Sequence, residues 1–381
     1  MTIVNHILKQ MPAVGQPQRK FLEILFSTIL ALRGRVNFRN LSRYCDYSER
    51  PIARQFRRPF DWPGFHQEVM SQALSPHSEV ISVQDASFIP KSGKQTFGLG
   101  HFTGGCTSRA ERGLEISTLA VVDVSRRCAF TLAVAQPPPG DDEVASPQEK
   151  EETRVDFYKQ QLPAQRHRLP PEVKYHAVDG YFAKKKYIDQ VVSLDLHPIT
   201  KLRCDAEGRF LFTKPHPPRR GRRRKYDGKV NFQDLSRFED LGTLEEAQAV
   251  HLYPAVVWHV SLKRRLRVVV LVNRKNPAKP RYIVFRRIRR WTAASWSSFT
   301  WRVSRSSSFF ATANSSPDSR TVKRALRPRS IFISMRAWRR SIWRAPRNCL
   351  PLRVSRRRSS RWQAGNNVSS MNDYSIYLLR A

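Results

Sequence analysis

Apolar residues are grouped along this chain in short runs that predict a mixed α/β protein. Residues 20–33 are strongly apolar and contain neither Gly nor Pro, which predicts a buried helix. The β-branched runs that predict strands are 80–83, 114–124, 129–135 and 175–178. The first three of these strands suggest an antiparallel meander. Two further helices are predicted at 146–162 and 184–194, and the Gly-rich stretch at 96–113 predicts a loop or loose hairpin.

Two short helices are predicted between residues 37 and 58. Asn40 or Ser42 is expected to cap the first of them. The second carries three arginines, Arg54, Arg57 and Arg58. Two short helices with arginines along the second resemble a helix-turn-helix that enters a DNA groove. The alternative is a small helical subdomain with a solvated basic face.

Two of the predicted strands end in an aspartate. Asp85 follows the run at 80–83, and Asp179 follows the run at 175–178, with Gly180 permitting a sharp exit. Taken alone, an aspartate at such a position is more often a turn former than a ligand-binding group. If the two strands are neighbours in one mixed sheet, however, both carboxylates meet at one edge. Paired carboxylates there are suited to hold one or two Mg²⁺ (or Mn²⁺) ions for phosphoryl transfer.

The charge balance predicts a polyanionic partner. The chain has 68 Lys and Arg against 31 Asp and Glu, a formal net charge of +37, and nucleic acid is the obvious partner. A membrane surface is less favoured, because no apolar run approaches the length that spans a bilayer. The five cysteines form no CxxC pair, so neither a zinc site nor a disulfide framework is indicated. A reducing cytoplasm fits this composition.

A second group of basic residues lies further along the chain. Residues 201–213 contain a predicted strand, and 256–262 with 266–272 predict a hairpin. Between them, 215–228 is a polybasic loop, which is either solvated or in contact with DNA phosphates. The basic residues predicted to bind DNA here, and in the loop after Asp85, are Arg219, Arg220, Arg222, Arg223, Arg224, Lys225, Lys91 and Lys94.

Three segments of the chain resemble DDE transposases of bacterial insertion sequences, of the type of insertion sequence four. They are 84–93 (Gln-Asp-Ala-Ser-Phe-Ile-Pro-Lys-Ser-Gly), 113–117 (Gly-Leu-Glu-Ile-Ser) and 178–182 (Val-Asp-Gly-Tyr-Phe). The resemblance covers roughly residues 20–285. It implies an RNase H-like mixed sheet within an α/β fold, two divalent metal ions, and cut-and-paste movement of double-stranded DNA in the bacterial cytoplasm. On the matching positions, Asp85 and Asp179 become the first and second catalytic carboxylates, and the working form is expected to be a homodimer.

The resemblance also implies a division of the chain. Residues 1–75 are expected to be a helical, helix-turn-helix-like DNA-binding region, and 76–200 the first part of the RNase H-like core. Residues 201–285 match a mostly β insertion that carries the polybasic loop. Residues 286–381 are rich in Arg, Ser and Trp and are expected to be a poorly ordered basic tail.

The third acid that the resemblance implies is missing. The family pattern is Tyr, two residues, Arg, three residues, Glu, then six residues to Lys or Arg, but no glutamate follows Glu246. The last 101 residues hold 23 Lys and Arg, two acids and six of the eight tryptophans. We therefore hypothesise that the chain is read out of frame from about Arg286. Codons that encode residues 303–309 exist whose neighbouring frame reads Arg-Phe-Gln-Ile-Glu-Phe-Leu.

Three functions are compatible with these features. The leading hypothesis is a DDE-type DNA transposase, in a degenerate copy with little or no activity because its third acid is absent. The second is a non-catalytic basic DNA-binding protein, in which the strand-end acids are structural. The third is a metal-dependent nuclease with the same core.

Overall fold

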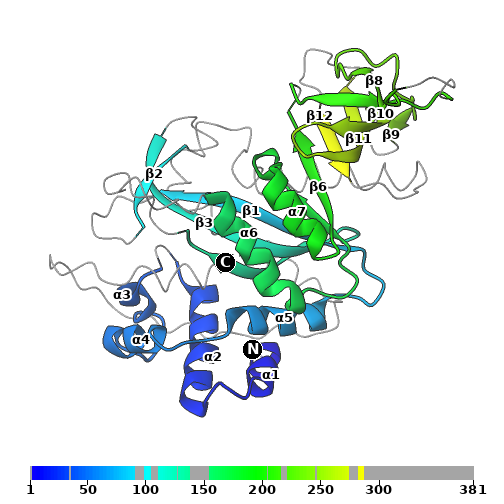
Figure 1. Cartoon of the computed structure of the whole chain (residues 1–381). Helices are drawn as coiled ribbons and strands as arrows, with labels where there is room; N and C mark the ends of the chain where they lie inside the picture. The colour runs from blue at the N-terminus through cyan, green and yellow to red at the C-terminus, as the bar shows by residue number, and fades with distance from the viewer. Residues whose placement is uncertain are drawn as a thin grey trace.

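A computed structural model describes most of the chain as far as residue 286. The described residues are 2–33, 36–90, 98–103, 110–126, 128–137, 154–203, 205–215, 221–244, 247–273 and 282–286. They form helices at the N-terminal end, a mixed sheet in the middle and a group of strands at the far end (Figure 1). Within these residues, no helix is both long and apolar enough to cross a bilayer.

The N-terminal part is a helical region with its own apolar core. Its helices are α1 (Thr2–Gln10), α2 (Gln16–Ala31), α3 (Phe38–Leu41), α4 (Glu49–Phe56) and α5 (Trp62–Ala73). Phe21, Leu25 and Ile29 recur at helical spacing along α2 and are buried with Leu41 of α3 and Ile52 of α4. The helical region is joined to the sheet through α5, where the His66 ring nitrogen Nδ1 lies 3.0 Å from the carbonyl oxygen of Leu132.

The central part is a mixed sheet whose strands run in the order β4-β3-β1-β5-β6. Strand β2 also pairs with β3, at residues 110–113, whereas β4 pairs with β3 at residues 117–123. Strand β1 pairs antiparallel with β3 but parallel with β5, which in turn pairs parallel with β6. The bounds are β1 (Val80–Pro90), β2 (Gly100–Thr103), β3 (Ala110–Asp123), β4 (Cys128–Ala135), β5 (Tyr175–Val178) and β6 (His197–Leu202).

Helices cover one face of this sheet (Figure 1). The elements between the parallel strands are α6 (Arg154–Gln165), the 3₁₀ turns η1 (Arg166–Arg168) and η2 (Gly180–Phe182), and α7 (Lys185–Ser193). Tyr158 of α6 and Tyr187 of α7 share one apolar cluster with Val80 and Val178. Alternate residues, such as Val83, belong to a separate cluster on the opposite face, because successive side chains of a strand point to opposite sides.

A group of strands follows β6 and extends the sheet. Strand β12 pairs with both β6 and β11, so it joins these later strands to the central ones. The order from β6 onward is β12-β11-β10-β7-β8, and β9 pairs with β10. The bounds are β7 (Gly208–Leu211), β8 (Tyr226–Lys229), β9 (Thr243–Leu244), β10 (Ala247–His259), β11 (Arg264–Asn273) and β12 (Tyr282–Arg286).

Several elements differ from the sequence-based expectation. The predicted strand at 80–83 is the first part of an eleven-residue strand, because β3 supplies a partner along its whole length. The loop or loose hairpin predicted at 96–113, by contrast, is a hairpin, because β2 pairs antiparallel with the first four residues of β3. Asn37 is the N-cap of α3, where it accepts a hydrogen bond from the backbone N–H of Asn40 at 2.7 Å; Asn40 is in the helix and Ser42 is at its C-terminal end. The first part of the predicted helix at 146–162 and all of 287–381 lie outside the described residues.

Candidate active site

The two predicted site aspartates are neighbours in the sheet. The parallel ladder between β1 and β5 consists of three residue pairs and ends where Gln84 lies opposite Val178. Asp85 and Asp179 are the next residues on the two strands. Asp85 is therefore not at the end of its strand, as the sequence predicted, because β1 continues along β3. It lies one position beyond the end of the parallel ladder, and so does Asp179.

Both carboxylates lie on the same face of the sheet. Side chains two residues apart in a strand point to the same face of the sheet. Asp85 therefore shares a face with Ile81 and Val83 of β1, and Asp179 shares a face with Ala177 of β5. Ile81, Val83 and Ala177 are all buried in the cluster that faces away from α6 and α7. The strand register and the strand period thus bring together two aspartates that are far apart in the sequence.

The backbone around each carboxylate limits its orientation. Asp85 Oδ1 accepts the backbone N–H of Ala86 at 2.9 Å. Asp179 caps the 3₁₀ turn that follows it, where its Oδ1 accepts the backbone N–H of Tyr181 at 2.8 Å. The hydroxyl of Thr200 in β6 donates to the carbonyl oxygen of Asp179 at 2.6 Å. These contacts leave carboxylate oxygens for a ligand on each side chain, since an ionised carboxylate accepts several hydrogen bonds.

Both aspartates are harder to ionise than an ordinary carboxyl. Burial, and then repulsion by Asp179, raise the pKa of Asp85 to about 7. Burial also raises the pKa of Asp179, although the backbone N–H groups that it accepts act in the opposite direction. Two half-buried carboxylates that repel each other are stabilised by a divalent cation between them.

Lys201 lies beside this pair, and sequence reasoning missed it. The β5–β6 register pairs Ala177 with Ile199, so two positions further on Asp179 faces Lys201. The positive charge of the Lys201 ammonium group lowers the pKa of both aspartates, in opposition to burial, which raises it. The sequence-based boundary at 200/201 separated Lys201 from the core. The period-two pattern from Ile199 to Lys201 was the feature that could have placed it on the face of Asp179.

Gly180 allows β6 to come this close to the turn after Asp179. A Cβ atom at position 180 would lie 3.3 Å from the carbonyl oxygen of Lys201 and 3.8 Å from its Cβ. The sharp exit that the sequence predicted at Gly180 is the turn η2, and α7 begins only at Lys185. Glycine is suited here because a larger residue would press on the strand that carries Lys201.

Asp123 shows what a purely structural strand-end aspartate looks like in this chain. It is fully buried at the end of β3 and accepts hydrogen bonds from the Ser78 hydroxyl at 2.7 Å and the Arg126 backbone N–H at 2.9 Å. Both of its carboxylate oxygens are thereby used to fix a turn. The bond of Asp85 to the adjacent Ala86 fixes no turn.

The residues present fit a divalent cation only in part. Asp85 and Asp179 supply hard oxygen ligands of the kind that Mg²⁺ prefers, and Mg²⁺ commonly keeps several waters beside one or two carboxylates. In the part of the chain that the structure describes, no group of three or more His, Cys, Asp and Glu is clustered for metal binding. The pair is thus a two-carboxylate site, with no third acid beside it among these residues.

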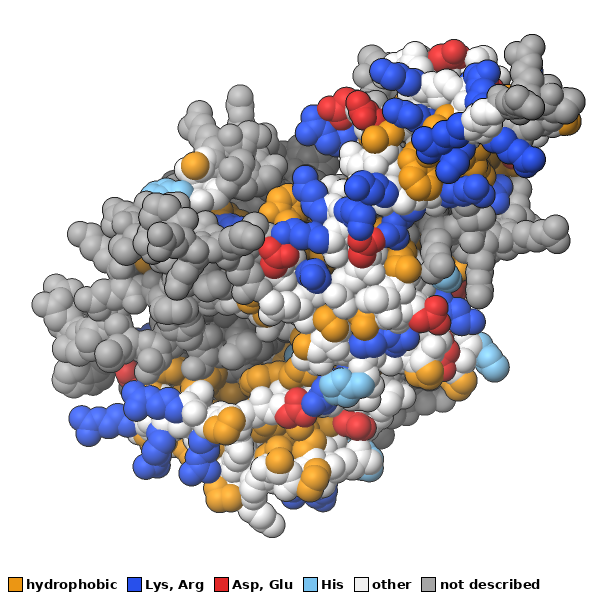
Figure 2. All heavy atoms as spheres, in the orientation of Figure 1, with side chains coloured by type: hydrophobic (Ala, Val, Ile, Leu, Met, Phe, Trp, Pro, Cys, Tyr) orange, Lys and Arg blue, Asp and Glu red, His pale blue; other side chains and the backbone are white. Residues whose placement is uncertain are grey.

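The predicted DNA-binding residues of the helical region lie together. Arg54 is in the last turn of α4, Arg57 caps that helix and Arg58 follows it; all three are exposed. Figure 2 shows Lys and Arg side chains gathered over the α3–α4 side of the helical region and over the strands that follow β6. The connection from α3 to α4 is seven residues long, which is longer than the turn of about three or four residues in a helix-turn-helix.

The second predicted basic group is described in part. Arg222, Arg223, Arg224 and Lys225 are exposed and lead into β8. Arg224 is held by Asp227, with a guanidinium-to-carboxylate distance of 2.8 Å, and its guanidinium lies 5.2 Å from the Phe212 ring centroid. The predicted DNA-binding residues outside the described ranges are Lys91, Lys94, Arg219 and Arg220.

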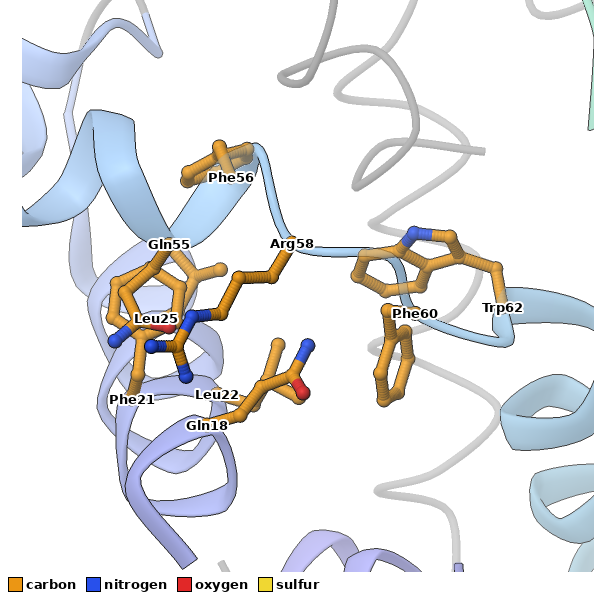
Figure 3. A pocket seen from close by; sticks show the side chains of 9 residues that line it. All are labelled: Gln18, Phe21, Leu22, Leu25, Gln55, Phe56, Arg58, Phe60 and Trp62. Carbon is orange, nitrogen blue, oxygen red and sulfur yellow. The ribbon is translucent and has the colours of Figure 1, made fainter. Parts of the chain in front are cut away.

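A small cavity lies within the helical region rather than at the aspartate pair. Its lining includes Phe21, Leu25 and Trp62. The Arg58 side chain extends from the end of α4 toward Gln18 across this cavity (Figure 3). The cavity is mainly apolar and shares its residues with the helical core, so it is a packing feature of that core.

Comparison with known proteins places the chain in a family. The family model for DDE superfamily endonucleases matches residues 11–265, a span that contains both Asp85 and Asp179. The chain therefore belongs to the DDE superfamily endonucleases. No curated protein matches its sequence.

Two solved structures of DNA-bound enzymes are distantly similar to the chain. A cryo-EM structure of the piggyBac transposase synaptic complex with hairpin DNA is 11% identical, with a TM-score of 0.35; the match covers 88% of this chain and 63% of that chain. Ciona intestinalis Endonuclease V in complex with a 23mer DNA containing an inosine is 9% identical, with a TM-score of 0.25, covering 68% of this chain and 90% of that chain.

Proposed function

We propose that this chain is a transposase of the DDE type whose core is RNase H-like and whose Asp85 and Asp179 together bind Mg²⁺ or Mn²⁺. The observation that carries the proposal is the position of the two aspartates on one face of the sheet, each one residue beyond the parallel β1–β5 ladder. Membership of the DDE superfamily endonucleases supports it. The proposed partner is double-stranded DNA, bound by a homodimer.

The residues of the chain have separate roles in this proposal. Asp85 and Asp179 hold the cation, and their mutual repulsion favours its binding over protonation above about pH 7. A bound divalent ion supplies Lewis-acid activation of a water or 3′-hydroxyl. Lys201 contacts a phosphate oxygen of the DNA next to the pair, where its positive charge offsets the negative charge of the phosphate. Arg54, Arg57 and Arg58 bind the DNA backbone away from the site.

We further propose that the chain is a degenerate copy. The pair lacks the third carboxylate of the family pattern, and no glutamate follows Glu246. Strand β12 still pairs with β6 and β11 up to Arg286, which is where the composition changes. The change is explained by a frameshift near that residue. Transposition activity is accordingly expected to be weak or absent.

A non-catalytic DNA-binding protein is the second candidate function. It is favoured by the absence of a cluster of three or more potential ligands among the described residues, together with the net charge of +37. In that case the arginines after α4 and before β8 carry the function, and the aspartates bind no metal. The two candidates differ in their response to Mg²⁺.

Magnesium is expected to stabilise the wild-type chain at pH 7.5. Ligand at 100 times its dissociation constant contributes about 2.7 kcal/mol, which corresponds to a rise in melting temperature of about 5 °C or more. Thermal unfolding with and without Mg²⁺ measures this rise. Asp85→Asn and Asp179→Asn should each abolish it, whereas Asp205→Asn, an exposed control, should keep it. An equal rise in all four proteins would favour the second candidate function.

Removal of the α4 arginines is expected to weaken DNA binding and its salt dependence. A variant with Arg54, Arg57 and Arg58 all changed to Gln should lower the slope of log affinity against log salt by about 0.9 for each phosphate that the variant no longer binds. Binding of a random-sequence duplex at several salt concentrations measures the slope. The charge-matched control changes the exposed residues Lys9, Lys20 and Arg33 to Gln. If the slope falls equally in both triple variants, the arginines contribute only net charge.

A further inference from the structure

A chain of buried polar side chains crosses the sheet on the face opposite the aspartates. The Ser82 hydroxyl lies 2.8 Å from His176 Nδ1, and His176 Nε2 lies 2.8 Å from the Tyr187 hydroxyl. Tyr187 donates to Gln84 Oε1 at 2.7 Å. Ser82, His176 and Gln84 are fully buried, and Tyr187 is 1% exposed. The chain of hydrogen bonds therefore connects β1, β5 and α7 without access to water.

The proton positions in this hydrogen-bond network can be assigned from its members. Because Tyr187 gives its only proton to Gln84, His176 Nε2 must donate to Tyr187. Burial lowers the pKa of His176 to about 3, so the ring is neutral and its Nδ1 is an acceptor. The Ser82 hydroxyl has one proton and two acceptors within reach, His176 Nδ1 at 2.8 Å and the Tyr175 carbonyl oxygen at 3.1 Å. The Gln84 amide Nε2 then donates to the Tyr158 carbonyl at 3.1 Å and lies 3.0 Å from Gln161 Oε1. The assigned tautomer thus has Nε2 protonated.

The position of this hydrogen-bond network is important for the strand register, because the β1–β5 ladder is short. Only three residue pairs hold the strands together, and Ser82, His176 and Gln84 belong to the first and last of them. A slip of one residue would move Asp179 to the face covered by α6 and α7. Apolar contacts specify the register weakly over so short a ladder, whereas a satisfied buried polar network allows a single arrangement.

We propose that Gln84, His176 and Tyr187 are positioning residues that fix the β1–β5 register and so hold Asp85 and Asp179 side by side. Gln84 and His176 lie on the two strands, and Tyr187 of α7 joins them as a bridge from the helix layer. The effect on the strand register is independent of any ligand. Its consequence for metal binding rests on the proposed function.

The test of the register uses Tyr187→Phe, which keeps the ring and removes the hydroxyl bridge. Hydrogen exchange of the metal-free protein should accelerate in segments 82–86 and 175–179 by about tenfold or more. The matched control, Val191→Ala, alters a buried residue of the same helix outside the network. Ser117→Ala is a second control, because Ser117 binds Gln84 on the side of β3, where the ladder has eleven pairs.

The exchange pattern decides the proposal. Faster exchange confined to the two segments in Tyr187→Phe, compared with both controls at equal global stability, supports a positioning role. The same exchange in Tyr187→Phe and Val191→Ala would overturn it, because the hydroxyl would then contribute packing and general stability only. If Tyr187→Phe does not fold, His176→Gln removes the same bridge and is read in the same way.

Metal affinity provides the link to the site. Mutation of a residue that orients a metal ligand typically lowers metal affinity by about 10- to 100-fold. Tyr187→Phe should therefore weaken Mn²⁺ binding by that factor, whereas Val191→Ala should leave it unchanged. Unchanged Mn²⁺ affinity in Tyr187→Phe would refute a positioning effect on the aspartates. If the wild-type chain binds no Mn²⁺, the proposed function fails, and the exchange experiment still decides whether the register depends on Tyr187.

Discussion

Replacing Asp85 with Asn is expected to stabilise the metal-free protein at pH 7.5 by about 2 to 3 kcal/mol and to change its stability little at pH 4. The pKa of Asp85 is about 7 in the folded chain and 3.8 in its ordinary state. Between these values the folded chain holds a proton that the unfolded chain has released. The stability of the wild type therefore falls as pH rises from about 4 to about 7. Asn carries no ionisable group, so the variant avoids this loss.

Urea denaturation in the presence of a chelator, at several pH values, measures the effect. The half-buried position of Asp85 is the reason for expecting less than the 4 kcal/mol or so that the full pKa difference would give. Asp205→Asn is the control, because Asp205 is exposed and pairs with Arg203. It should show no gain at pH 7.5. A wild-type stability that does not fall across this pH range would show that Asp85 is not held in a repulsive, buried pair.

Restoring the reading frame after residue 285 is expected to raise DNA cleavage by at least about 100-fold, because a missing carboxylate leaves the reacting groups mispositioned. The substrate is a plasmid that carries the chain's own gene with its flanking sequence, incubated with Mg²⁺. The unaltered chain should leave the plasmid intact. The frame-restored chain should cleave it, and Asp85→Ala in that chain should abolish cleavage.

The nucleotide sequence gives an independent check of the same prediction. The alternative frame after residue 285 should continue and encode the Arg, three residues, Glu pattern. Efficient cleavage by the unaltered chain, abolished by Asp85→Ala, would contradict the view that it is a degenerate copy. An alternative frame that stops at once would leave the altered composition after Arg286 without this explanation.

The aspartate pair could be predicted from the sequence because the signals for it are local. Each aspartate follows a β-branched run, and the family motifs around both positions favoured a metal ligand over an ordinary turn residue. That prediction assumed that the two strands are neighbours in one sheet, and the parallel pairing of β1 with β5 meets this condition. The length of β1 was underestimated because its continuation depends on β3, a partner more than twenty residues away.

The parts that were missed depend on contacts between distant segments. Lys201 was assigned to the insertion, because the period-two pattern from Ile199 to Lys201 predicts a strand without showing that this strand pairs with β5. The hydrogen bonds of Gln84 with Tyr187 and Gln161 span 103 and 77 residues. Polar residues inside apolar runs marked these positions, but their partners become evident only from the packing of α6 and α7 on the sheet.

The central claim is that Asp85 and Asp179 form one divalent-cation site, and a Mn²⁺ titration followed by electron paramagnetic resonance tests it most directly. The wild-type chain at pH 7.5 should bind Mn²⁺ at a site from which Mg²⁺ displaces the Mn²⁺ ion. Asp85→Asn and Asp179→Asn should each lose that site, and the double variant should lose no more than either single variant. Binding that is equal in the wild type and in both single variants would contradict the claim.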